Sequence, residues 1–175
     1  MKPDKPVENY INKVLDEKRS EFGGKRVCPF AARELQTNKL MIAEVGDKNL
    51  VDLMGDFKNS NHESAIFIIK EDIPAEQTKS FQIFVNKLLK QNGLAEYKNI
   101  CFNPRDDVSV DGYNPRSLAP YFMINIANAA ISVAVVNNTR FEFDIGRQVN
   151  PYVSNEVALN PHDFGSLLDK NKFRV

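Results

Sequence analysis

The sequence is poor in the residues that build disulfide scaffolds and metal centres. Among its 175 residues are two cysteines, Cys28 and Cys101, and two histidines, His62 and His162. The cysteines are not spaced as metal ligands, and neither histidine stands in a zinc-ligand spacing or beside a serine in a nucleophile-elbow pattern. These counts and spacings argue against a disulfide scaffold, a zinc finger, a zinc hydrolase and a serine triad, and we identify no metal ligands.

Net charge and glycine-rich phosphate loops are also lacking. Basic and acidic residues both number 23, so the formal net charge is 0. The broad basic surface of a nucleic-acid or anionic-membrane binder is therefore missing. Gly23-Gly24 stands alone without a Gly-x-Gly or Walker pattern, so nucleotide binding has no support. We expect neither nucleic acid nor a membrane as partner, and the oligomeric state stays open.

No stretch at the start of the sequence has the apolar character of a signal peptide, so we expect a reducing, cytoplasmic environment. The apolar segment 117–136 is long enough to suggest a membrane span. It contains Pro120, Asn125, Asn128 and Ser132, whose polar groups are costly in hydrocarbon. A buried strand, or a strand followed by a helix, is the better interpretation of this segment.

The apolar patterns predict one layered domain. Hydrophobic residues make up 42% and charged residues 26% of the chain, as in ordinary globular proteins. Strands are expected at residues 39–45, 65–69, 99–102, 121–126 and 141–145, and helices over 7–22, 50–57 and 74–93. Segment 131–136 is either a strand or a buried helix. The order of elements predicts an α/β or α+β fold, with a mixed sheet of four to six strands and helices packed on it.

Three parts are expected along the chain: an N-terminal helix in 1–24, a core domain in 25–146, and a C-terminal tail in 147–175 packed on the core. Residues 65–69 are apolar without interruption, which is typical of a central strand covered on both faces. In 141–145, Phe141, Phe143 and Ile145 alternate with acidic residues, which is typical of a half-exposed edge strand.

Cys28 is the candidate catalytic residue. Pro29 fits the first position of a helix, which would make Cys28 its N-cap. A thiol at the positive end of a helix, with Lys25 and Arg26 upstream, is expected to have a lowered pKa and to react as a thiolate. The alternative is that Cys28 is a small buried residue that caps the helix. Ala31 stands where a thioredoxin-type motif has its second cysteine, so an internal disulfide cycle is not expected.

The loop 104–120 is the longest polar interval of the chain. Arg105 and Arg116 are candidates for binding a carboxylate or phosphate, because a guanidinium can donate two parallel hydrogen bonds to such a group. We expect Asp106, Asp107 and Asp111 to be solvated, because their spacing is not that of a calcium loop.

His62 precedes the central strand on the side that Cys28 could approach. It is the candidate ligand or acid–base residue. The alternative is an exposed histidine at the end of a helix, favoured there by the helix dipole.

Several short motifs resemble the bacterial protein family catalogued as domain of unknown function 1415. They are Cys28-Pro29-Phe30-Ala31, Phe102-Asn103-Pro104, and Asn114-Pro115-Arg116-Ser117 continuing to Pro120-Tyr121. The resemblance spans about residues 7–136 and implies a shared site at Cys28, Arg116 and Pro120, without naming a reaction. Asn103 and Tyr121, at matched positions, become candidate substrate-binding residues. Asn103 stands where the family has histidine, so a role carried by that histidine does not transfer.

More distantly, the cysteine-proline start followed by strands and a long helix resembles haem- or iron-dependent enzymes that hydroxylate amine or guanidine nitrogen. Axial ligation would then fall on Cys28, His62 or His162. No cofactor is required by the sequence, and haem or iron stays open.

The leading hypothesis is a small cytoplasmic enzyme or redox-responsive protein that acts on a small anionic molecule. The Cys28 thiolate would be the reactive group, with Arg116 and Arg105 orienting the anion. One alternative is a non-catalytic module whose long loop and edge strand bind a protein partner. The other is the haem- or iron-dependent oxidative enzyme. Whether the protein is an enzyme stays open.

Overall fold

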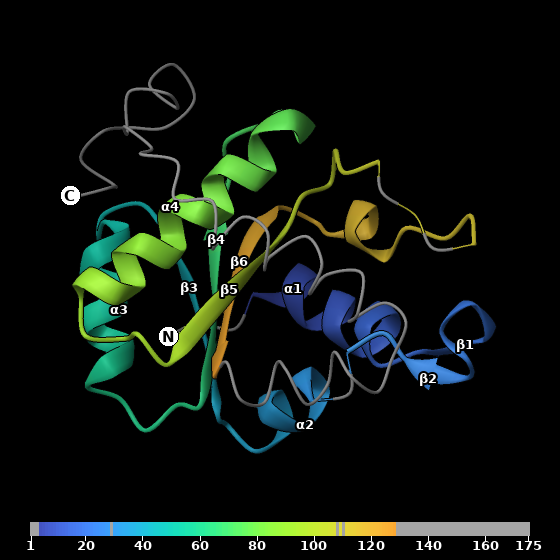
Figure 1. The fold of residues 1–175 in the computed structure, drawn as a ribbon. Coiled ribbons are helices and arrows are strands. Elements are labelled where there is room, and N and C mark those ends of the chain that lie inside the picture. The colour runs from blue at the N-terminus through green and yellow to red at the C-terminus, as the bar shows by residue number, and fades with distance from the viewer. Residues whose placement is uncertain (1–3, 29, 108, 110, 129–175) are drawn as a thin grey trace.

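The computed structural model describes residues 4–28, 30–107, 109 and 111–128. The strands are β1 (Lys18–Arg19), β2 (Lys25–Arg26), β3 (Leu40–Glu44), β4 (Ser64–Ile69), β5 (Tyr97–Phe102) and β6 (Phe122–Asn128). The helices are α1 (Lys5–Tyr10), α2 (Ala31–Gln36), α3 (Leu50–Lys58) and α4 (Thr78–Gln91). The predicted class is confirmed: a mixed four-stranded sheet has helices packed against it in one α/β-type domain (Figure 1).

The sheet has the strand order β3-β4-β6-β5. β3 and β4 are parallel, and β6 runs antiparallel to both β4 and β5. The central position predicted for residues 65–69 is confirmed, since β4 has a neighbour on each side and all six of its residues are buried. Because β3, β4 and β5 run in one direction, their carboxyl ends meet the start of β6 at a single edge of the sheet.

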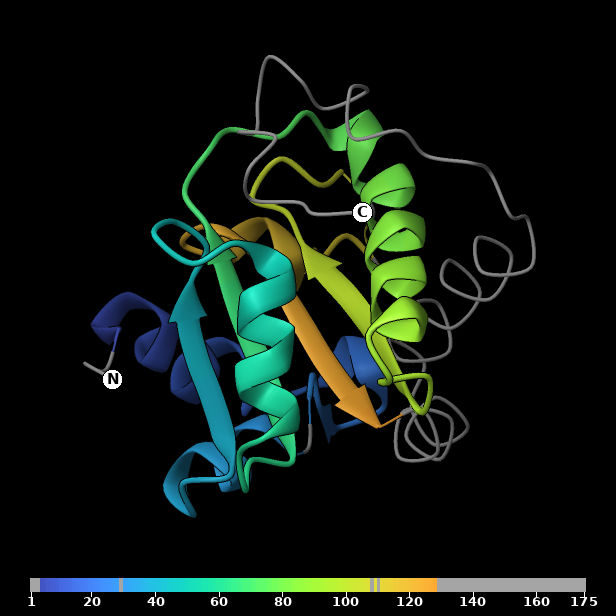
Figure 2. The same cartoon turned by 90° about the vertical axis from the view of Figure 1, so that its left-hand side faces the viewer.

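Each face of the sheet is covered by its own set of helices. α3 and α4 lie over one face, in front of the sheet in Figure 2, and pack on Phe67 and Ile69 of β4. α1 and α2 lie over the other face and pack on Ile66 and Ile68. The side chains of β4 therefore alternate between two apolar cores, which explains its uninterrupted apolar sequence.

The N-terminal helix is shorter than predicted. α1 continues as a π-helical turn over Ile11–Leu15 and ends there, whereas the apolar spacing predicted a helix to residue 22. β1 and β2 then pair antiparallel around Gly23 and Gly24, whose φ angles are +66° and +77°. Two consecutive glycines in the left-handed region allow this tight reversal, which replaces the last part of the expected helix.

The helix predicted over 74–93 begins later than expected. A 3₁₀ turn over Ala75–Gln77 follows Pro74, and α4 starts at Thr78. Its end agrees with the prediction, since Gly93 has a φ of +75° just beyond the helix.

Amide side chains of α4 hold the outer edge of β5. Asn86 Oδ1 accepts hydrogen bonds from the Asn99 backbone N–H at 3.0 Å and from Asn99 Nδ2 at 2.8 Å. Gln82 Oε1 accepts a hydrogen bond from the Cys101 backbone N–H at 2.9 Å. These donors would otherwise be unpaired at an edge strand, so α4 completes the hydrogen bonding of β5.

Some predictions concern parts of the chain outside the described residues. They are the elements at 131–136 and 141–145, the tail 147–175, and His162. Of the apolar segment 117–136, residues 122–128 form β6. None of the helices in the described ranges has the length and apolar character needed to cross a membrane.

Candidate functional site

A cavity of about 170 Å³ lies at the edge of the sheet where β4 and β5 end and β6 begins. Open α/β sheets commonly bind ligands beyond the carboxyl ends of their strands. Its lining comes from the segments that follow β4 and β5 and precede β6: Ile69, Lys70, Glu71, Asp72, Asn103, Pro104, Arg105, Pro120, Tyr121 and Phe122. Three of the predicted substrate-binding residues, Asn103, Arg105 and Tyr121, therefore lie together here.

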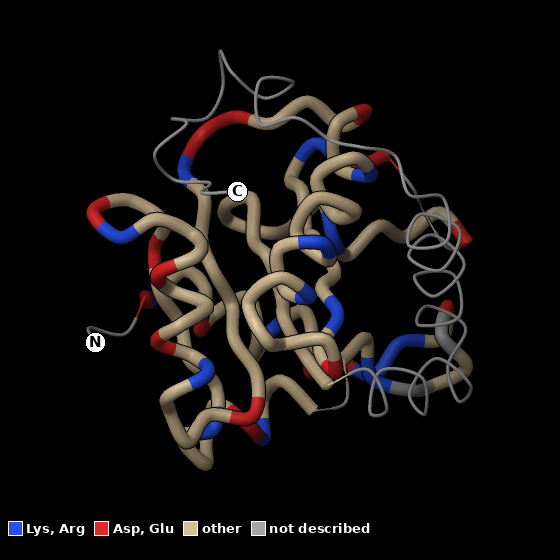
Figure 3. The backbone as a smooth tube through the Cα atoms, turned by 60° about the vertical axis from the view of Figure 1, so that its left-hand side comes forward, with Lys and Arg blue, Asp and Glu red and all other residues tan. Residues whose placement is uncertain are grey.

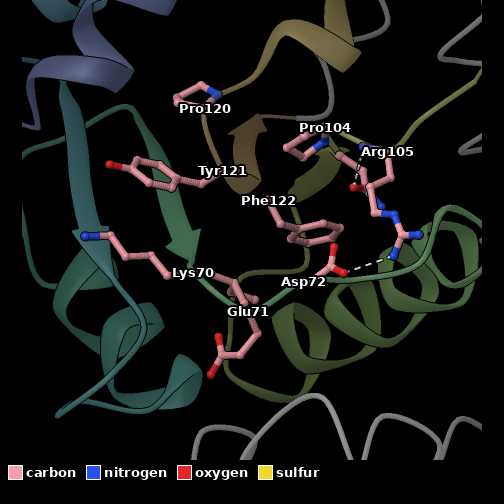
Figure 4. Close-up of a pocket in the computed structure, with 10 residues that line it drawn as sticks. Lys70, Glu71, Asp72, Pro104, Arg105, Pro120, Tyr121 and Phe122 are labelled. Atoms are coloured by element: carbon pink, nitrogen blue, oxygen red, sulfur yellow. Dashed lines mark hydrogen bonds and ion pairs between the residues drawn. The ribbon is translucent and has the colours of Figure 1, made fainter.

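Two cationic side chains stand on opposite sides of this cavity (Figure 4). Arg105 Nη1 lies 3.0 Å from Asp72 Oδ2, and these side chains are 54% and 75% exposed. Lys70 Nζ lies 3.5 Å from Glu44 Oε2, with both side chains about half exposed. Exposed ion pairs of this kind contribute at most about 1 kcal/mol to stability. Each cation is therefore held only weakly by its carboxylate.

The wall between these cations is apolar. Phe122 is buried, and its ring packs edge-on against the ring of Phe81, with centroids 5.1 Å apart. The Tyr121 ring carries Lys70 Nζ 5.2 Å from its centroid. Pro104 and Pro120 fix the backbone on either side, because proline restricts φ. The cavity thus combines fixed apolar walls with charged groups at its rim.

Asn103 shapes the cavity through its hydrogen bonds. Its Nδ2 donates to the Ile73 carbonyl at 2.9 Å and to Thr78 Oγ1 at 2.8 Å. Its Oδ1 accepts from the Arg105 backbone N–H at 2.9 Å. The residue is 1% exposed. These contacts hold the Asn103 amide against Ile73, Thr78 and the Arg105 backbone. Asn103 therefore positions Arg105 and the start of α4.

Cys28 is not the N-cap that the sequence predicts. α2 begins at Ala31, and Phe30 occupies its N-cap position. The Cys28 backbone N–H donates to the Leu15 carbonyl at 2.8 Å, and the Val27 N–H donates to the Glu17 carbonyl at 3.3 Å. Residues 27 and 28 therefore run alongside residues 15–17, and this pairing delays the start of the helix.

Cys28 and Arg116 lie in one neighbourhood, around Tyr10. The Tyr10 hydroxyl donates to the Pro115 carbonyl at 2.6 Å. Burial raises the pKa of the Tyr10 phenol, Tyr113 and Cys28 raise it further, and the Arg116 guanidinium lowers it. The structure therefore brings these two predicted residues near the same hydroxyl group, although neither lines the cavity.

Arg116 is engaged inside the protein. Its Nε lies 3.3 Å from Asp106 Oδ2, and the two side chains are only 4% and 9% exposed. The expectation that Asp106 is solvated is wrong, because the loop folds its carboxylate onto this guanidinium. The Asn114 side chain, whose Nδ2 donates to the Asp106 carbonyl at 2.6 Å, secures the same turn.

His62 lies away from the cavity. It precedes the amino end of β4, whereas the cavity lies at the carboxyl end of that strand. Its backbone N–H donates to Ser60 Oγ at 3.2 Å, in the turn that follows α3. Within the described ranges, no three His, Cys, Asp or Glu residues are grouped so that they could hold a metal ion.

Sequence reasoning missed the charged residues that follow β4. Lys70, Glu71 and Asp72 line the cavity but belong to no motif. Their position gave a signal: they come directly after the strand predicted to be central, and polar residues at that end of a strand commonly carry function.

Charged positions of both signs are interspersed over the described backbone (Figure 3). This distribution is consistent with the balanced net charge of the full sequence. Comparison of the chain with protein-family models, with curated proteins and with solved structures gives no match. The resemblance to domain of unknown function 1415 stays a prediction.

Proposed function

We propose that the protein binds a small organic anion in the cavity between the ends of β4 and β5 and the start of β6. The main support is an apolar wall flanked by two cations, Lys70 and Arg105, whose ion pairs among the described residues are with exposed carboxylates. Such a site offers charge to an anionic group and apolar contact to the rest of the ligand. Small-molecule sites generally combine these two kinds of surface.

Arg105 is the anchor in this proposal. A guanidinium donates two parallel hydrogen bonds to a carboxylate or phosphate, and Asp72 now takes the place of such a group. A ligand must displace Asp72, which is weakly held because the pair is exposed. Asp72 therefore competes with the ligand, and its removal should strengthen binding.

The walls define the remainder of the ligand. The volume of about 170 Å³ limits the ligand to a few small groups. The lining residues Phe122, Pro104 and Pro120 present apolar surface. Burial of apolar area contributes roughly 25 cal/mol per Å² to the free energy of binding. An anion with an apolar body should therefore bind more tightly than a compact inorganic anion.

Benzoate and inorganic phosphate test this proposal when each is titrated into the full-length protein at fixed ionic strength. Binding is followed by NMR shifts of the Arg105 and Phe122 amides. We expect benzoate to bind more tightly than phosphate. Arg105→Gln should weaken benzoate binding about 10- to 100-fold, because a charge-assisted hydrogen bond contributes about 1.5–3 kcal/mol. Asp72→Asn should strengthen it by up to about fivefold.

The exposed pair Lys48–Asp56 provides the matched control, since its atoms lie 2.7 Å apart away from the cavity. Asp56→Asn makes the same change in charge and should leave benzoate affinity unchanged. If Asp72→Asn and Asp56→Asn change benzoate affinity equally, the effect comes from the overall charge of the protein and not from the cavity. Retained affinity in Arg105→Gln would contradict the proposal.

Thiol chemistry at Cys28 is the second candidate function, favoured by the placement of Cys28 and Arg116 around Tyr10. Cys28 is half-buried, whereas Cys101 is fully buried and its burial raises the pKa of the thiol well above its usual value. We expect iodoacetamide to modify one thiol per folded chain and to modify none in Cys28→Ser. If Cys28 acts as a thiolate, its labelling should follow a pKa below about 8.5.

Labelling that follows an ordinary thiol pKa would contradict thiolate chemistry at Cys28 without affecting the anion site. Cys101→Ser is the control, because it should leave the single modification in place. The interaction module and the haem or iron enzyme stay predictions; the ultraviolet–visible spectrum and iron content of protein made in iron-replete medium test the latter.

A further inference from the structure

The two cations at the rim of the cavity belong to segments that one strand separates. Lys70 directly follows β4, and Arg105 lies three residues beyond the end of β5. β6 lies between these two strands in the sheet, and neighbouring strands are about 4.8 Å apart, so β4 and β5 are about 10 Å apart. Lys70 and Arg105 accordingly lie on opposite sides of Phe122 (Figure 4). The cavity therefore offers two separate positions for negative charge.

Each of these cations already contacts a carboxylate of the protein. Arg105 Nη1 lies 3.0 Å from Asp72 Oδ2, and Lys70 Nζ lies 3.5 Å from Glu44 Oε2. The Asp72 and Glu44 side chains are 75% and 51% exposed. A carboxylate that loses its partner is costly when it is buried. Because both of these carboxylates are in contact with water, two carboxylates of one ligand can replace them at little cost.

The surface between the two cations is apolar. Phe122 is buried at the start of β6, and Pro104 and Pro120 line the same cavity. Tyr121 extends this surface toward Lys70, whose Nζ lies 5.2 Å from the centre of the Tyr121 ring. A polar group placed against this surface would lose hydrogen bonds to water. The part of a ligand that joins the two positions for negative charge should therefore be apolar.

We infer that the ligand is a dicarboxylate with a short apolar chain, which binds Arg105 through one carboxylate and Lys70 through the other. This inference rests on the proposed function, because it requires that the cavity takes an organic anion. A monocarboxylate at Arg105 leaves Lys70 paired with Glu44, whereas a dicarboxylate contacts both cations. The cavity volume of about 170 Å³ excludes a long chain between the two carboxylates.

Glutarate and pentanoate test this inference, because they have equal numbers of carbon atoms and differ in the second carboxylate. Each is titrated into the full-length protein at neutral pH and fixed ionic strength, and binding is followed by NMR shifts of the Tyr121 and Phe122 amides. Glutarate should bind about fivefold more tightly than pentanoate, which is the upper range for an exposed ion pair. Lys70→Gln should remove this preference and leave pentanoate affinity unchanged, whereas Arg105→Gln should weaken the binding of both.

A zwitterion is the competing ligand, because the acidic residues Glu71 and Asp72 also line the cavity. The compound 5-aminopentanoate carries an ammonium group where glutarate has its second carboxylate. Beside Lys70 this ammonium meets a like charge, so 5-aminopentanoate should bind no more tightly than pentanoate. Tighter binding of 5-aminopentanoate than of glutarate would overturn the inference.

Lys48→Gln is the matched control, because it removes the same charge from the Lys48–Asp56 pair, which does not line the cavity. It should leave the preference for glutarate unchanged. A preference that survives Lys70→Gln would overturn the inference, because the second carboxylate would then bind elsewhere. If glutarate binds no more tightly than pentanoate although benzoate binds, the inference fails and the anion site stands. If none of these carboxylates binds, the proposed function fails with it.

Discussion

Asp106→Ala is expected to lower the free energy of unfolding by about 3–5 kcal/mol, which is the usual cost of leaving a buried charge without its partner. The Asp106 carboxylate lies 3.3 Å from Arg116 Nε, and both side chains are almost fully buried. Without the carboxylate, the buried guanidinium loses this ion pair while it stays shielded from water. Urea unfolding followed by circular dichroism measures the effect.

Two further variants separate the buried charge from the loss of one side chain. Asp72→Ala breaks an exposed ion pair and should lower the free energy of unfolding by less than about 1 kcal/mol. Replacing both buried partners, in Asp106→Leu with Arg116→Met, should recover much of the lost stability, because apolar residues of similar volume often replace a buried pair without cost. If the double variant is as unstable as the sum of the single ones, the buried ion pair is not the cause.

Elements governed by local patterns could be predicted from the sequence. β4 was predictable because its uninterrupted apolar run has the length of a strand, and α3 because its apolar residues recur at helical spacing. Both signals come from residues adjacent in the chain. The mixed character of the sheet also followed from the order of its elements.

Features that depend on the path of the backbone could not be predicted in this way. The Asp106–Arg116 pair forms because the loop folds back on itself. The sequence separation of the two residues does not predict this path of the backbone. Cys28 is not a helix cap because its N–H bonds to Leu15, a contact set by the β1–β2 hairpin. Pro29 predicts a helix start from local sequence alone, and it does not predict that Cys28 pairs with Leu15.

Buried polar groups were the hardest features to predict from the sequence. Glu34 is a helical glutamate of ordinary appearance, yet it is buried and accepts a hydrogen bond from Ser64 Oγ at the start of β4. Burial raises the pKa of this carboxyl group, and the Ser64 hydrogen bond lowers it in part. The partners lie on different elements, so only the packing of α2 on the sheet reveals them.

Asn86→Ala is expected to lower the free energy of unfolding by about 2–3 kcal/mol. Asn86 Oδ1 accepts both the backbone N–H and the side-chain amide of Asn99, at 3.0 and 2.8 Å. Asn86 Nδ2 is buried without a partner in the described part of the protein, so the loss arises from Oδ1. A buried N–H without an acceptor costs about 1–3 kcal/mol, and the cavity left by the side chain adds to this.

Gln91→Ala is the matched control, because Gln91 is an exposed amide at the end of the same helix. It should change the free energy of unfolding by no more than about 0.5 kcal/mol. Asn86→Ala should also speed hydrogen exchange at the Asn99 amide at least tenfold, while the Cys101 amide, held by Gln82, changes less. Similar stability in the two variants, with the Asn99 amide still protected, would show that α4 does not complete the hydrogen bonding of β5 through Asn86.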